Sequence, residues 1–237
     1  MSERSSTAAL QAFLERAKGS SAAEGAKIIS LADRASELAA ARSVAAPRWQ
    51  LDELVGRLTE LSGIGAVASL SAVTSLVLEA QGRGEPAVWI GLPPASFFPP
   101  DLDDAGVDLD ALVVVRAPDV TAMVRAADRL LRSAAFGLVI LDLGPAAAAA
   151  VAAAISIVVQ GRLVGLAQHH AAAIVVITEK PRDAASLGSM VSLRAEAVRE
   201  RSLGGRGWRM TVRAVKDKRR GPGWNELADV VGPAGLV

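Results

Sequence analysis

Four short runs of uninterrupted apolar residues stand out in the middle of the chain. They occupy residues 87–90, 112–115, 138–141 and 174–177. A strand that is covered by helices on both faces of a sheet has no polar side, so its sequence lacks the alternation of a half-exposed strand. The pattern therefore predicts four buried strands of a parallel sheet.

Segments with helical spacing separate these runs. Between 119 and 131, apolar residues that we expect to point inward recur at helical intervals, and Asp119 precedes them as a candidate N-cap; they are Val120, Met123, Val124, Ala127, Leu130 and Leu131. Residues 64–80 have the pattern of a similar buried helix. Helices that alternate with strands are typical of an α/β fold with a parallel sheet.

The apolar period changes near the C-terminal end. Apolar and polar residues alternate over 191–197 and again over 208–214, which predicts half-exposed antiparallel strands. The glycine-rich residues 203–207 between them predict a hairpin turn. We therefore expect an α/β domain whose mostly parallel sheet gains antiparallel edge strands at its C-terminal side.

The first 48 residues differ from the rest of the chain. They are rich in alanine, serine and charged residues, and their thin apolar stripes (Leu10, Phe13 and Leu14, for example) predict weakly amphipathic helices that dock on another surface. We divide the chain into an N-terminal helical segment (1–48), a core (49–220) and a C-terminal tail (221–237).

Composition narrows the possible chemistry. The chain has 237 residues, 51% of them apolar, and a formal net charge of +1, which is typical of a folded domain. It contains no cysteine, so disulfides and thiolate-bound metals are excluded. The adjacent His169 and His170 are the only imidazoles, and we expect them to be packing or surface residues, with no metal site.

We expect a cytoplasmic protein, because the sequence begins without a basic and then apolar leader. One membrane alternative is the long apolar stretch 143–161. Most of its apolar residues are alanines, however, and no aromatic residues flank it. A buried helix followed by a buried strand is the better interpretation, and we expect no membrane partner.

Charge is distributed unevenly along the sequence. Residues 85–142 contain nine acidic residues against four arginines, whereas residues 199–220 contain nine basic residues against two acidic ones. Such asymmetry indicates surfaces of opposite charge, although the net charge is close to zero.

The residues around 58–71 have the pattern of a strand, a turn and a helix where a phosphate-binding loop would lie. Such a loop needs glycines, a lysine for the terminal phosphates and a Ser/Thr hydroxyl for magnesium. The glycines are present, but a serine stands at the lysine position and a leucine at the hydroxyl position. We interpret the segment as a degenerate phosphate loop, with a turn that binds no ligand as the alternative; its residues are Gly63, Gly65, Ala68, Ser69 and Leu70.

Asp142 follows the apolar run 138–141, where a nucleotide-binding sheet would carry its magnesium-associated aspartate. An aspartate after a buried strand is common in itself. In nucleotide-binding folds, however, a glycine turn comes first in the sequence and a strand that ends in aspartate follows it. Because the same order is found here, we interpret Asp142 as a vestigial Walker B residue.

Several segments of the sequence resemble the RecA family. Residues 106–114 look like the segment between that family's second and third core strands, Pro118-Asp119 follows at the family's spacing, and 212–218 is similar to its paired-lysine strand. More closely, the chain resembles the ImuA family, RecA-like accessory proteins of bacterial mutagenic translesion synthesis. The short length and the Thr59–Gly63 turn without its lysine carry this resemblance, which implies a RecA-like three-layer domain over about residues 50–230.

The departures from the RecA pattern imply lost catalysis. The stretch 91–98, where recombinases carry a glutamate that activates water, contains no acid. Without the lysine, the magnesium hydroxyl and this base, phosphoryl transfer lacks its positioning groups. Only 179–186 remains of the second DNA-gripping loop. We expect no enzymatic activity, no catalytic residues and no cofactor.

The basic end is retained, and the resemblance implies that lysines at the positions of Lys216 and Lys218 reach a nucleotide held by a neighbouring subunit. Contact with DNA phosphates is one alternative, and a solvated strand edge protected by charge is another. The residues that we expect to contact a partner, a nucleotide in trans or DNA are Arg213, Lys216, Lys218, Arg219 and Arg220, with Trp224 as a docking residue.

The resemblance implies an adaptor in the SOS response to DNA damage. Its partners would be a RecA recombinase filament, the polymerase-like protein ImuB and an error-prone DNA polymerase. Two alternatives are a weak ATPase of the same fold and a DNA-binding recombination accessory protein.

Overall fold

The computed structural model describes residues 49–65, 67–94, 97–146, 148–201 and 208–230. The contacts between residues divide the chain into two units, Met1–Ala46 and Pro47–Val237. Every described residue belongs to the second unit. The expected N-terminal helices (1–48) and the expected turn at 203–207 lie outside the described residues.

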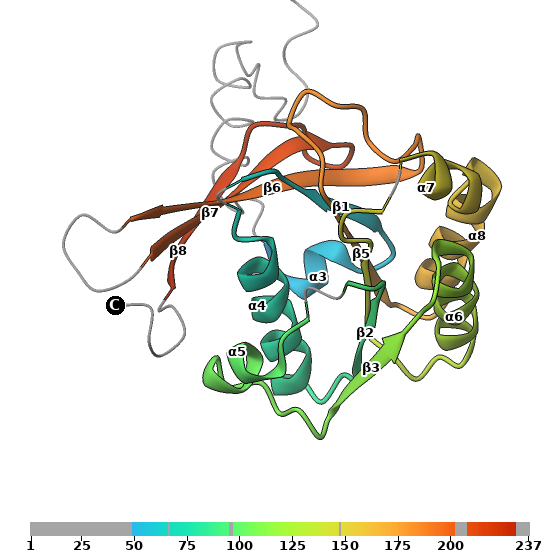
Figure 1. Cartoon of the computed structure of the whole chain (residues 1–237), viewed down its shortest axis with the longest axis horizontal. Helices are drawn as coiled ribbons and strands as arrows, with labels where there is room; N and C mark the ends of the chain where they lie inside the picture. The colour runs from blue at the N-terminus through green and yellow to red at the C-terminus, as the bar shows by residue number, and fades with distance from the viewer. Residues whose placement is uncertain (1–48, 66, 95–96, 147, 202–207, 231–237) are drawn as a thin grey trace, which may run out of the picture. The chain divides into compact units, whose positions relative to one another are not determined.

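A single eight-stranded sheet forms the centre of this unit (Figure 1). Its strand order is β3-β2-β4-β5-β1-β6-β7-β8, and the neighbours from β3 to β6 pair in parallel, whereas β6–β7 and β7–β8 are antiparallel. The predicted fold class, an α/β domain with antiparallel C-terminal edge strands, is thereby confirmed. The strands are β1 (Leu58–Ser62), β2 (Ala87–Gly91), β3 (Leu112–Arg116), β4 (Leu138–Asp142), β5 (Ala173–Thr178), β6 (Val191–Arg201), β7 (Trp208–Asp217) and β8 (Asn225–Val230).

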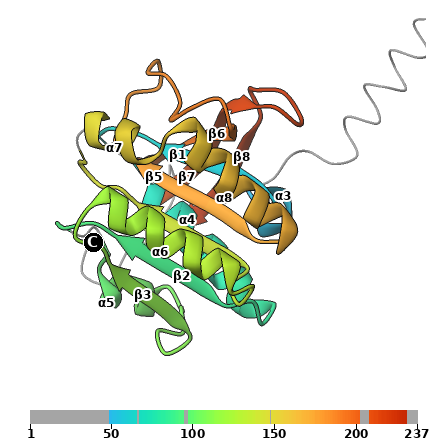
Figure 2. The ribbon, with the colours of Figure 1, turned by 90° about the vertical axis from the view of Figure 1, so that its right-hand side faces the viewer.

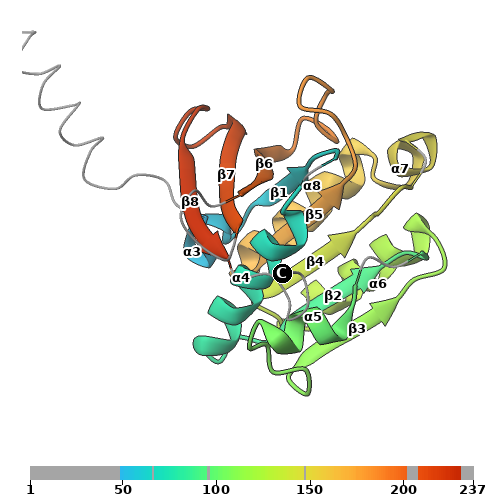
Figure 3. The same ribbon diagram turned by 60° about the vertical axis from the view of Figure 1, so that its left-hand side comes forward.

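Helices cover both faces of the sheet, and each face has its own apolar cluster. Figure 2 shows α6 and α8 side by side over one face, and Figure 3 shows α4 and α5 on the other side. The helices are α3 (Leu51–Leu54), α4 (Ser69–Gly82), α5 (Pro99–Asp104), α6 (Val120–Arg132), α7 (Ala148–Ala154) and α8 (Ile157–His169). Within the described part of the chain, no helix is both long and apolar enough to cross a bilayer.

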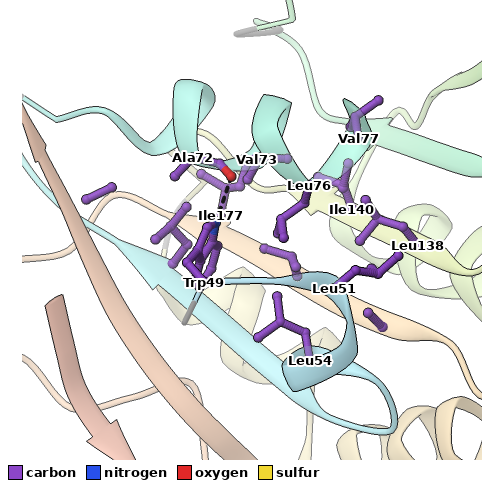
Figure 4. Close-up of a cluster of buried hydrophobic side chains, with 14 of the residues drawn as sticks. Trp49, Leu51, Leu54, Ala72, Val73, Leu76, Val77, Leu138, Ile140 and Ile177 are labelled. Atoms are coloured by element: carbon purple, nitrogen blue, oxygen red, sulfur yellow. Dashed lines mark hydrogen bonds between the residues drawn. The ribbon is translucent and has the colours of Figure 1, made fainter. Parts of the chain in front are cut away.

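The first described residues are anchored in the core beneath α4. The buried indole of Trp49 donates to the carbonyl of Ala72 in the first turn of α4, at 2.7 Å (Figure 4). Leu51 and Leu54 of α3 are buried in the same cluster as Leu76 of α4 and Leu138 of β4. This packing fixes the start of the unit against the helix that follows the glycine turn.

Two expectations about the strands need correction. Residues 112–115 were expected to be buried on both faces, but β3 is the edge strand, and Val113 and Val114 are 43% and 40% exposed. Residues 225–230 were expected to lie in a tail, but they form β8, which pairs with β7 from Trp208↔Val230 to Arg213↔Asn225. The polar sequence of β8 hides it, because it lies at an edge of the sheet and contributes few apolar residues to the core.

The Asp119 cap was predicted correctly. Its Oδ1 accepts a hydrogen bond from the amide of Ala122 at 2.8 Å, and α6 buries Val120, Met123, Ala127 and Leu131 as expected. The cap satisfies an amide that would otherwise have no partner at the helix start.

Replacing Asp119 by alanine should lower the free energy of unfolding by about 1 kcal/mol, because that amide loses its acceptor. Asp119→Asn, which keeps a capping oxygen, should lose less than half of this. Urea denaturation followed by circular dichroism measures both variants, and equal losses would contradict the cap as the source of the effect.

Candidate functional site: the carboxyl end of β1

The predicted strand, turn and helix are present as β1, a turn that includes residues 63–65 and 67–68, and α4, although the helix begins at Ser69 and not at residue 64 as expected. Gly65 has φ +81°, a conformation that favours glycine. The turn hydrogen-bonds to the chain's own carbonyls: the amide of Gly63 donates to Thr178 at 3.3 Å, that of Val67 to Gly65 at 2.8 Å and that of Ala68 to Ala197 at 2.9 Å. These three amides are therefore already satisfied, whereas a phosphate loop directs its amides at the ligand.

The side chain of Val67 lies against the start of the turn. A Cβ built on Gly63 would lie 2.4 Å from Cγ1 of Val67, so a side chain there would overlap it. Ser69, at the expected lysine position, is buried, and Leu70, at the expected magnesium position, is a partly exposed apolar residue. Ala68 is the N-cap residue of α4 and makes no side-chain capping bond.

Asp142 lies at the same edge of the sheet as the turn. β5 separates its strand from β1, with Asp142 opposite Ile177 and Leu61 opposite the same residue from the other side. Its carboxylate is buried and accepts hydrogen bonds from the indole of Trp89 at 3.3 Å and from the amide of Gly144 at 3.2 Å. The expected Walker B position is therefore filled by an aspartate that has an internal structural role.

Sequence reasoning missed a charged group within β1 itself. Glu60 is fully buried; its carboxylate forms an ion pair with Lys180 and accepts hydrogen bonds from Thr178 Oγ1 at 3.1 Å and from the Leu187 amide at 2.8 Å. A buried charge is stable only when it is paired and hydrogen-bonded. Glu60 thus holds both ends of the 179–190 connection against the core. The presence of a glutamate inside this predicted strand could have indicated the buried charge from the sequence.

Arg194 of β6 holds the same connection from the neighbouring strand. Its buried guanidinium donates to Ser62 Oγ at 2.9 Å and to the carbonyls of Pro181, at 2.7 Å, and Ala184. The 179–190 connection is therefore attached to β1 and β6 by the buried side chains of Glu60 and Arg194.

Two of the predicted basic residues face this connection. Lys216 Nζ lies 3.2 Å from Ser186 Oγ, and Lys218 donates to the carbonyl of Ser189. Burial lowers the pKa of Lys216, nearby Lys218 and Arg194 lower it further, and Glu60 partly offsets the effect. The expected lysine pair therefore lies together beside the 179–190 connection.

The other predicted basic residues contact different parts of the unit. Arg213 pairs with Glu200 at 3.3 Å on the exposed surface, Arg219 donates to the carbonyl of Val55 at 3.2 Å, and Arg220 pairs with Glu53 at 2.5 Å. The five residues therefore form no single cluster: two contact the 179–190 connection, two contact α3 or the residue after it, and one contacts β6.

Trp224, the predicted docking residue, is partly buried beneath this end of the sheet. Its indole donates to Asp217 Oδ2 at 3.1 Å, and Asp217 also forms a buried ion pair with Arg57 at 2.6 Å. Burial alone would raise the pKa of Asp217, but hydrogen bonds from the Arg219 amide, Trp224 and Arg57 lower it below its ordinary value. Trp224 thus stabilises a buried ion pair that joins the start of β1 to the end of β7.

No protein-family model matches this chain, and a search of curated proteins finds no match. Within the described residues, no group of three or more histidine, cysteine, aspartate or glutamate side chains could hold a metal ion.

The contact between Gly63 and Val67 can be tested by a double-mutant cycle. Gly63→Ala should destabilise the unit by about 1–3 kcal/mol, because the new methyl group overlaps Val67. The same change in a Val67→Ala background should cost clearly less. Urea denaturation of the four proteins measures the coupling, and equal costs in both backgrounds would contradict the close contact.

The Arg57–Asp217 pair predicts a specific dependence of stability on pH. Asp217→Asn should lower the free energy of unfolding by about 3–5 kcal/mol at pH 7, because it leaves Arg57 buried without a counter-charge. The pKa of Asp217 is lower in the folded than in the unfolded chain, where it is about 3.9. The stabilisation is therefore complete above about pH 4 and is lost as pH falls through the lower folded value.

The difference between wild type and Asp217→Asn should accordingly shrink as the pH is lowered from 5 towards about 2.5. Asp229→Asn is the control, because Asp229 pairs with Arg209 on the exposed surface and should contribute less than about 1 kcal/mol. A difference for Asp217→Asn that stays constant over this range would contradict the assignment.

Proposed function

We propose that this chain is a non-catalytic, RecA-like adaptor of DNA-damage-induced mutagenesis in the bacterial cytoplasm. In this role it links a recombinase filament to an error-prone polymerase complex that includes the polymerase-like protein ImuB. The strand order supports the RecA-like interpretation, because the glycine turn after β1 and Asp142 at the end of β4 lie at the same end of the sheet, with β5 between their strands. Ligands of open α/β sheets bind at this end.

The absence of catalysis in this proposal is supported by the hydrogen bonds that the groups at this end of the sheet make within the chain. The amides of Gly63, Val67 and Ala68 donate to backbone carbonyls, and the carboxylate of Asp142 accepts from Trp89 and Gly144. A magnesium–triphosphate would need these groups to break their present bonds. Phosphoryl transfer depends on groups positioned in advance for the transition state, so this arrangement favours a scaffold over a catalyst.

The surface that we assign to partner binding is the end of β7 and the turn after it. Lys218, Arg219 and Arg220 are exposed there; Lys218 lies beside the 179–190 connection, whereas the two arginines contact α3 and the residue after it. The bonds that Glu60 and Arg194 make to that connection support a preformed surface, which binds with a smaller loss of conformational entropy than a mobile loop. Trp224 contributes through the Arg57–Asp217 pair that holds this end of β7 in place.

A binding assay with purified partners tests the proposal. The full chain is immobilised and exposed to recombinase filaments formed on an oligonucleotide, and separately to the ImuB-type protein. Wild type should bind both, and Lys218→Glu/Arg219→Glu should weaken at least one interaction by about tenfold or more, because reversed charges disrupt electrostatic complementarity.

The matched control is Arg83→Glu/Arg116→Glu, which reverses the same number of charges at the end of α4 and on edge strand β3. It should bind both partners as wild type does. If wild type binds neither protein, the adaptor role is wrong. If both double variants bind like wild type, the assignment of this surface is wrong.

A further inference from the structure

The acidic stretch 85–142 contributes to two surfaces of opposite charge. Five of its nine acids lie on α5 and on the connection from α5 to β3, on the side of the sheet that carries α4 (Figure 3). Phe98, the residue before α5, is 57% exposed beside them. We call this surface the acidic face; it consists of Phe98, Asp101, Asp103, Asp104, Asp108 and Asp110, and all five aspartates are exposed.

Arginines lie on the other side of the sheet, on α6 and α8. Asp128 joins the two helices, because its carboxylate pairs with Arg132 at 3.0 Å and with Arg162 of α8 at 2.5 Å. Val158 precedes Arg162 by four residues, so the two side chains lie on the same face of α8. We call this surface the arginine face; it consists of Arg125, Arg129, Arg132, Arg162 and Val158, which is 78% exposed.

Most of these charges form no ion pair with another residue that the structure describes. Arg125 and Arg129 are four residues apart on α6, where like charges repel, and neither forms an ion pair or side-chain hydrogen bond within the described residues. Asp103 and Asp104 lie at the carboxyl end of α5, where the helix dipole disfavours negative charge. Both faces thus keep unfavourable charges, and each has an exposed apolar residue beside them.

We propose that the acidic face of one copy of this chain docks on the arginine face of a second copy. The carboxylates would pair with Arg125 and Arg129, which form no ion pair within the described residues, and Phe98 and Val158 would supply the apolar contacts of the interface core. Because the two faces lie on opposite sides of the sheet, the contact is heterologous and leaves one free face at each end of the assembly. The proposal does not rest on the adaptor role.

Sedimentation velocity of the full chain tests this contact. Wild type should associate in a concentration-dependent manner at about 0.05 M salt and dissociate at about 0.5 M, where the Debye length falls from about 14 Å to about 4 Å. Arg125→Glu/Arg129→Glu should weaken self-association at least about tenfold, and so should Asp101→Arg/Asp103→Arg, because each variant brings like charges together.

An equimolar mixture of these two variants should associate again, because each then offers the other a complementary face. Arg182→Glu/Arg209→Glu, which reverses two exposed charges outside both faces, should behave like wild type. A wild type that stays monomeric at about 100 μM in low salt would overturn the proposal.

Two further outcomes would also overturn it. One is self-association of wild-type strength in the Arg125→Glu/Arg129→Glu variant. The other is a monomeric wild type that binds a fluorescent oligonucleotide through Arg125 and Arg129, which would make the arginine face a polyanion site.

Discussion

At the carboxyl end of β1, backbone amides and buried side chains form hydrogen bonds within the chain. These bonds hold the glycine turn and the 179–190 connection in place. The amide of Ala68 donates to Ala197 of β6, so the glycine turn is joined directly to the neighbouring strand. Glu60 and Arg194 then attach the 179–190 connection to β1 and β6. Because these groups are buried, loss of any one would leave a polar partner without its hydrogen bond, which costs more than the bond itself contributes.

The fold itself does not depend on the groups at this end of the sheet. Strand order and packing depend on the apolar clusters on the two faces of the sheet, and these need neither a lysine in the turn nor a free aspartate after β4. Trp89 belongs to one of these apolar clusters, and its indole donates a hydrogen bond to the carboxylate of Asp142. In our proposals, the sheet serves as a scaffold and the charged surfaces around it bind partners.

The parallel strands, the Asp119 cap and the turn after β1 could be predicted because each has a local pattern in the sequence. The exposure of β3 could not, since its composition matches that of β2 and only the strand order makes it an edge. The bonds that close the site were also hidden: Ala68 and Ala197, or Glu60 and Lys180, are far apart in sequence and have no common motif. Charge summed along residues 85–142 likewise concealed that the aspartates of α5 and the arginines of α6 lie on opposite sides of the sheet.

Isothermal titration of the full chain with ATP and magnesium tests the central claim most directly. If the amides of the turn and the carboxylate of Asp142 are held by internal bonds, no binding should be detected at millimolar nucleotide, which corresponds to a free energy of binding weaker than about −4 kcal/mol. Micromolar binding that requires magnesium and is lost in Asp142→Asn would contradict it, because that carboxylate would then have to exchange its internal partners for the nucleotide's cation.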